Sequence, residues 1–249
     1  MQRFKHNAKK YTLLSCVFLF LFLFLWFYYC YSFIDLPNQS DVLIKFTDKD
    51  ILVNLFSGNY QGYKFIALLS LPFAFAVNYL ISNENPQIIL RMKNRGEYVK
   101  YCTFHIIVFS AIFSFLHEAV NMICISCFYS NDLILELKLP AYTLINFLTL
   151  FIYFSRMGGL FLLIRFCVNP KFAPFLLLVL YFIEFHISAF INIYFPINDS
   201  IVIFELISGT ADIVDVIALS IRGVSLIIIV FIAVYFKFQK KDILRYEKQ

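Results

Sequence analysis

Long apolar segments limit the folds open to this chain more than any other feature. Of its 249 residues, 61% are apolar and 20% are aromatic, whereas a water-soluble domain is roughly half apolar. The segments are about 20 residues long, the length that crosses a hydrocarbon core of about 30 Å as a helix. They run without polar alternation, which predicts helices rather than the strands of a barrel.

We therefore predict an all-α integral membrane protein with six transmembrane helices and cytoplasmic N- and C-termini, built as a single polytopic membrane domain over residues 1–249. The predicted spans are about 12–33, 65–81, 98–117, 141–164, 172–194 and 218–236. The last span is the least defined, because only 224–236 is uninterrupted. We therefore expect Arg222 at the outer interface, where a long side chain can reach water.

Lysine and arginine are sorted between alternate connections. When Lys100 and Arg222, at the ends of their spans, are counted with the neighbouring connections, fifteen of the 21 lie before the first span, after the last one, or after the second and fourth spans, and five lie on the opposite side. Basic loop residues mark the cytoplasmic side of a membrane protein. The sorting therefore predicts that both ends of the chain are inside.

The connection after the second span has the signals of a short helix at both ends. Asn85 suits the N-cap, Pro86 suits the first helical position, and Gly96 suits a left-handed residue just past the end. Arg91 and Arg95 are four residues apart and would share one face. Two interpretations stay open: a helix that docks on a partner protein, and a basic helix that binds anionic lipid headgroups.

Ionisable residues within the spans are candidates for function, because a charge in hydrocarbon costs several kcal/mol. Glu184 is predicted near the middle of the fifth span, with His186 on the other side of that helix. Arg156, in the fourth span, is expected to reach the inner interface by extending its side chain, and pairing with Glu184 is the alternative.

A second polar group is expected at the outer end of the third span. His117 and Glu118 lie close to Asn121 at three and four residues' spacing, so the three can share one helix face. For these residues, as for Glu184 and His186, a structural pairing and a place along a substrate pathway both stay open.

No motif of a self-contained enzyme is present. The chain lacks a Gly-x-Ser-x-Gly, a His-Glu-x-x-His and a glycine-rich phosphate loop, and it lacks the glutamate pair of CAAX-type intramembrane proteases. Cys124 and Cys127 form a lone Cys-x-x-Cys among apolar residues, which favours plain packing over a metal or redox site. We therefore expect no catalytic residue, no metal and no nucleic-acid partner.

The chain resembles the small permease subunits of the ABC-2 type from bacterial ABC exporters. The resemblance rests on six spans with both ends inside, the basic first cytoplasmic loop 89–95, the apolar and acidic segment before the last span, and the ending 238–244. It implies a location in the bacterial cytoplasmic membrane and export of a peptide, a lipid or an amphipathic toxic compound.

The resemblance also implies partners. Two permeases, identical or homologous, would pair, and each would dock a separate ATPase that binds ATP and Mg²⁺. The docking residues would be Ile88, Arg91, Met92, Lys93 and Arg95, and the segment 201–215 would form short outer helices that gate the exit. The alternative is a stand-alone membrane protein, either an immunity or stress factor or a lipid-modifying enzyme that uses His117, Glu118 or Glu184.

Overall fold

The structure is a computed structural model of the chain. It describes residues 2–34, 63–82, 95–191, 206–207, 209 and 212–239. All regular elements within these ranges are helices, which agrees with the predicted all-α class. Their bounds are α1 (Gln2–Ile34), α3 (Tyr63–Ser82), α5 (Arg95–Phe128), α6 (Asn131–Glu136), α7 (Leu139–Cys167), α8 (Ala173–Ile191) and α10 (Ile213–Gln239).

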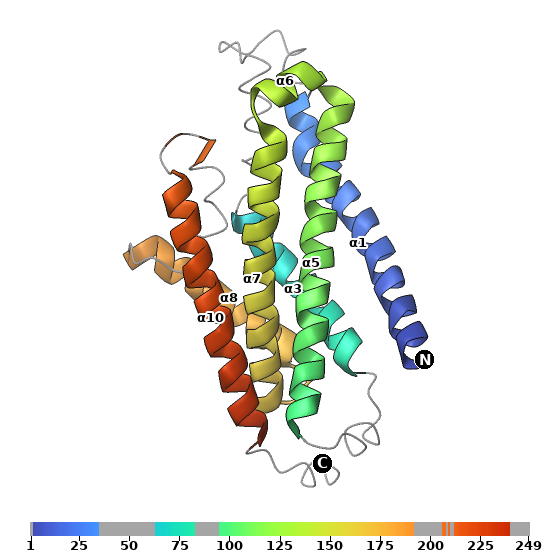
Figure 1. The fold of residues 1–249 in the computed structure, drawn as a ribbon, viewed down its shortest axis with the longest axis vertical. Coiled ribbons are helices and arrows are strands. Elements are labelled where there is room, and N and C mark those ends of the chain that lie inside the picture. Colours follow the sequence, from blue (N-terminus) through green and yellow to red (C-terminus); the bar gives the residue numbers. More distant parts are fainter. Residues whose placement is uncertain are drawn as a thin grey trace.

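Four of these helices form a row. Figure 1 shows α10, α7, α5 and α1 side by side, with α3 and α8 crossing the row at an angle. The short α6 joins α5 to α7 at one end of the row. The start of α1 and the end of α10 both lie toward the opposite end of the bundle.

The contacts between α5 and its neighbours fix the direction of each helix. Along α1 and α5, contact partners rise together, as in Phe22 with His117 and Trp26 with Asn121, so the two helices are parallel. Along α5 and α7, partners run in opposite order, from Tyr98 with Phe166 to Glu118 with Asn146, so these helices are antiparallel.

The same reasoning makes α7 and α10 parallel. An added Cβ at Gly223 would meet Ile152, and one at Gly159 would meet Val230, so both helices advance by the same seven residues between these two contacts. Two parallel helices of one chain require a return passage between them. The chain must therefore reverse its direction between α1 and α5 and again between α7 and α10. The helices α3 and α8 lie in these two intervals of the sequence.

Four helical segments are long and apolar enough to cross a membrane, namely Ala8–Tyr28, Gly96–Phe128, Leu139–Cys167 and Ile213–Gln239. They correspond to the first, third, fourth and sixth predicted spans, and they mark the chain as a multi-pass membrane protein. The second and fifth predicted spans fall on α3 and α8. Their described apolar stretches, Leu69–Ile81 and Ala173–Glu184, are shorter.

One predicted helix end was wrong. Gly96 is the second residue of α5 rather than a left-handed residue that ends a preceding helix. The last long helix begins at Ile213, five residues before the predicted span of about 218–236, because Asp212 and Asp215 cap it reciprocally. The Asp212 carboxylate accepts from the N–H groups of Val214 and Asp215 at 2.8 and 3.0 Å, and the Asp215 carboxylate accepts from the N–H of Asp212 at 2.9 Å.

Glycines bring α7 close to both of its long neighbours. A Cβ at Gly158 would lie 2.3 Å from a methyl carbon of Ile106 on α5. A Cβ at Gly223 of α10 would lie 2.4 Å from a methyl carbon of Ile152 on α7. Small residues allow close backbone approach where lipid supplies no hydrophobic driving force, so dispersion contacts between the helices replace it.

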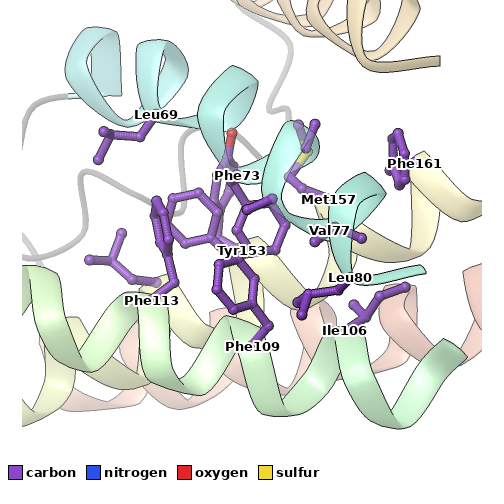
Figure 2. Packing of buried hydrophobic residues seen from close by; sticks show 14 of the residues in the cluster. Leu69, Phe73, Val77, Leu80, Ile106, Phe109, Phe113, Tyr153, Met157 and Phe161 are labelled. Carbon is purple, nitrogen blue, oxygen red and sulfur yellow. The ribbon is translucent and has the colours of Figure 1, made fainter. Parts of the chain in front are cut away.

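The centre of the bundle is aromatic. Phe73 of α3 points toward Phe109 and Phe113 of α5 in Figure 2, with ring centroids 5.6 and 5.2 Å away. The ring of Phe154 on α7 lies 4.9 Å from that of Phe73. Aromatic pairs of this kind each contribute about 0.5–1.5 kcal/mol beyond their buried area. They fix α3 against the row of long helices.

Candidate functional site

One face of α7 carries four polar side chains inside the bundle. Asn146, Thr149, Tyr153 and Arg156 follow one another at intervals of three and four residues, which places them on one side of the helix. All four are buried, with 1%, 7%, 3% and 6% of their surface exposed. Over ten residues this face covers about 15 Å, half of a hydrocarbon core of about 30 Å.

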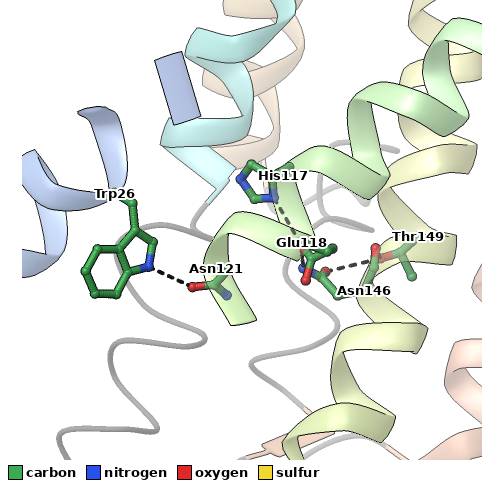
Figure 3. Close-up of polar contacts among 6 residues, drawn as sticks. All are labelled: Trp26, His117, Glu118, Asn121, Asn146 and Thr149. Atoms are coloured by element: carbon green, nitrogen blue, oxygen red, sulfur yellow. Dashed lines mark hydrogen bonds and ion pairs between the residues drawn. The ribbon is translucent and has the colours of Figure 1, made fainter. Parts of the chain in front are cut away.

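The end of this face that carries Asn146 and Thr149 meets α5. Glu118 accepts a hydrogen bond from the Asn146 amide at 2.9 Å and lies 3.0 Å from Nδ1 of His117 (Figure 3). The Thr149 hydroxyl donates to the Asn146 carbonyl at 2.9 Å. The predicted outer group therefore has a partner on α7, through the Oε1 atom of Glu118.

Asn121 belongs to a different contact. Its side-chain oxygen accepts from the indole N–H of Trp26 at 3.0 Å, and this bond joins α5 to α1. The rings of His117 and of Phe22 on α1 pack edge to face, with centroids 5.3 Å apart. The predicted trio on α5 thus divides its contacts between α1 and α7.

The end of the face that carries Arg156 meets α8. The Nη1 and Nη2 atoms of Arg156 both lie 3.4 Å from Oε1 of Glu184, and the two side chains are 7% and 17% exposed. The pairing alternative is therefore confirmed, and the expectation that Arg156 extends to the inner interface was wrong. Because Glu184 supplies a counter-charge inside the bundle, the Arg156 side chain does not need to extend to water.

The aromatic ring of Tyr153 lies next to the ion pair. The ring centroid of Tyr153 lies 5.6 Å from Cζ of Arg156, and the Tyr153 hydroxyl lies 3.0 Å from the Ser70 hydroxyl on α3. His186 is exposed and stacks on Phe182 with centroids 6.4 Å apart.

A small hollow lies along the polar face of α7, between Thr149 and Arg156. Its volume is about 20 Å³, which accommodates one water molecule. It is too small for a peptide or lipid cargo in this conformation. The lining residues come from α7 and α10 and are Thr149, Ile152, Tyr153, Arg156, Leu219, Ser220, Gly223 and Leu226.

Charged groups gather at the two ends of the row. Near Tyr98, Phe166 and Phe238, whose rings pack together, lie Lys100, Arg165 and Lys237. At the other end, α6 carries Asp132 and Glu136, and the start of α10 carries Asp212 and Asp215. Glu97 at the first of these ends and Lys138 at the other are exceptions, so among the described residues the charge sorting at the helix ends is partial.

Some predicted residues lie outside this picture. Ile88, Arg91, Met92 and Lys93 are outside the described residues, and so is most of the predicted gating segment 201–215, whereas Arg95 is the first residue of α5. Cys124 and Cys127 are free thiols, the first buried and the second exposed. Among the described residues, no three His, Cys, Asp or Glu side chains gather as a metal site would require.

Sequence reasoning named Glu184 with its partner Arg156, but for Glu118 and Asn121 it missed the residues on other helices that hold them. Trp26 is bonded to Asn121, Asn146 is bonded to Glu118, and Thr149 is bonded in turn to Asn146. The intervals of three and four residues along 146–156 were a signal for the polar face of α7. Comparison with protein-family models, curated proteins and solved structures finds no match to this chain.

Proposed function

We propose that this chain is the membrane-spanning permease subunit of an ATP-driven transporter of the ABC-2 type. It would cross the bacterial cytoplasmic membrane six times with both ends inside. The sorting of basic residues supports this orientation. The parallel pairs of α1 with α5 and α7 with α10 support counting α3 and α8 as the second and fifth spans, because each pair needs a return passage.

The observation that carries the proposal is the unbroken course of α5. The helix begins at Arg95, directly after the basic loop 83–94, and continues past His117, Glu118 and Asn121. From Arg95 to His117 it rises by about 33 Å. A partner that displaced the basic loop would move one stiff helix, and with it the hydrogen bonds that tie α5 to α1 and α7.

The partner in this proposal is a separate ATPase subunit that supplies ATP hydrolysis and Mg²⁺. Its docking residues would be Ile88, Arg91, Met92, Lys93 and Arg95, with the arginines facing acidic groups on the ATPase. Charge pairs of this sort set partner choice and association rate more than affinity. A second permease copy or a homologue would complete the transporter.

The enzyme alternative has less support from the geometry. His117 is 0% exposed and Glu118 is 2% exposed, and both are engaged within the bundle. A lipid substrate has no access to them in this conformation. Glu184, at 17% side-chain exposure, is held by Arg156.

Co-purification with a separate ABC-type ATPase subunit tests the proposal. Arg91→Glu combined with Arg95→Glu should abolish both association and cargo export, because two docking charges are reversed. Lys171→Glu, an exposed charge reversal in the turn between α7 and α8, is the matched control and should leave both intact. Export that survives the double reversal, or protection of cells in the complete absence of an ATPase, would contradict the proposal.

A further inference from the structure

The hollow between α7 and α10 has one polar wall and one apolar wall. Thr149, Tyr153 and Arg156 line it from α7, and Leu219, Gly223 and Leu226 line it from α10, where Ser220 is the one hydroxyl among its lining residues. The hydrogen bonds of the lining residues show which chemical group suits the space.

As long as they keep their bonds to backbone carbonyls, the hydroxyl groups of Thr149 and Ser220 can only accept from a ligand. Thr149 uses its single hydroxyl hydrogen on the carbonyl of Asn146 at 2.9 Å, and Ser220 uses its own on the carbonyl of Val216 at 2.8 Å. A hydroxyl has one donor hydrogen and two acceptor lone pairs. A ligand in the hollow must therefore donate to these oxygens.

Arg156 offers the opposite chemistry. Its two hydrogen bonds both go to one oxygen of Glu184 at 3.4 Å, longer than the roughly 2.7–2.9 Å of a strong charge-assisted bond. A guanidinium has five N–H donors. A ligand in the hollow can therefore accept from Arg156 while the contact with Glu184 persists.

These requirements favour a neutral group over an ion of either sign. An anion cannot donate to Thr149 and Ser220, and it would approach the carboxylate of Glu184. A cation would approach the guanidinium of Arg156. A neutral hydroxyl group both donates and accepts, and a space of about 20 Å³ admits one such group.

We propose that this hollow binds a neutral hydroxyl group, supplied either by water or by the polar end of an amphipathic alcohol whose apolar part lies along Leu219 and Leu226. The site then joins the pair Arg156–Glu184 to the hydrogen bonds of Thr149, Asn146 and Glu118. The proposal rests on the proposed transport function only in regarding such an alcohol as cargo. Binding itself needs no ATPase.

Head-group selectivity tests the site in the full chain in lipid nanodiscs. Trp26 is the single tryptophan and is buried, so its fluorescence reports thermal unfolding. Decanol, decanoate and decylamine share one chain length and differ in charge. At about five times its Kd, decanol should raise the Tm by roughly 2–4 °C, and the two charged compounds should give a smaller shift.

Matched variants identify the hollow as the cause. The preference for decanol should vanish in Thr149→Val with Ser220→Ala, and Ser220→Ala alone should weaken it. Ser225→Ala should keep it, because Ser225 makes the same hydroxyl-to-carbonyl bond, to Ile221 at 2.8 Å, on the exposed face of α10. Equal shifts for all three compounds, or a preference that survives the double variant, would overturn alcohol binding.

A second measurement separates water from alcohol as the source of the hydroxyl. A structure of the full chain in nanodiscs without added alcohol, at a resolution that shows waters, should place density about 2.7–3.2 Å from Arg156 and Thr149. An empty hollow with both side chains ordered would overturn water binding. Loss of decanol selectivity in a chain that still binds its ATPase would refute this site and leave the proposed function standing.

Discussion

Glu184→Gln tests the buried ion pair through the free energy of unfolding. The change keeps the size of the side chain and removes the charge that faces Arg156. The Arg156 side chain is 7% exposed, and the nearest oxygen of Glu184 lies 3.4 Å from it. Removing one partner of a buried pair costs about 3–5 kcal/mol because the other charge stays buried. The long distance and the 17% exposure of Glu184 place the expected cost at the lower end, about 3 kcal/mol.

Thermal unfolding followed by Trp26 fluorescence measures this cost. About 3 kcal/mol corresponds to a fall in Tm of roughly 6–12 °C for a chain of this size. His186→Gln, at an exposed position two residues further along α8, should change the unfolding free energy by no more than about 0.5 kcal/mol. Replacing both Arg156 and Glu184 by methionine should restore most of the stability, because no uncompensated charge remains.

The reasoning would be refuted by a small effect of the single change. A cost below about 1 kcal/mol for Glu184→Gln is the range of exposed ion pairs, and it would mean that water or lipid headgroups already solvate Arg156. A double methionine variant that is less stable than Glu184→Gln would also contradict the account. It would show that the pair contributes more than mutual neutralisation.

Three further changes test the helices. Gly158→Ala should cost about 1–3 kcal/mol of unfolding free energy, because its Cβ would lie 2.3 Å from a methyl carbon of Ile106, and no loss of Tm would contradict the close approach of α5 and α7. Gly96→Ala should stabilise the chain by about 0.5–1 kcal/mol if the residue is helical, whereas a left-handed residue would make alanine unfavourable. Asp212→Ala should cost about 1 kcal/mol, since it removes the cap of α10, and equal hydrogen exchange in the first turn of α10 would rule the cap out.

Hydropathy predicted the helices well because it reports the solvent that each segment prefers. Four of the predicted spans correspond to helices long and apolar enough to cross a membrane. It predicted their ends less well, because ends depend on local hydrogen bonds. The reciprocal cap of Asp212 and Asp215 starts α10 five residues before the predicted position, and Gly96 continues into α5 where composition favoured a stop.

The polar contacts were harder to predict than the polar residues. A buried Glu184 signals that a partner is needed, and Arg156 was a candidate because both residues were predicted within the membrane. Trp26 and Asn121 are 95 residues apart in the sequence, so their contact depends on the register between α1 and α5. No local sequence pattern contains that register. The intervals of Asn146, Thr149, Tyr153 and Arg156 were visible in the sequence, and polar periodicity within apolar helices is therefore a useful signal for the interior face of a span.

The side of the membrane on which each end of α7 lies tests the central claim most directly. Lys138 precedes this helix and Lys171 follows it, and both are exposed. In a background without the six native cysteines, Lys138→Cys and Lys171→Cys are treated with a membrane-impermeant maleimide in intact cells. The account predicts labelling of Lys138→Cys in intact cells, and of Lys171→Cys only after permeabilisation. The reverse pattern, or labelling of both in intact cells, would contradict it.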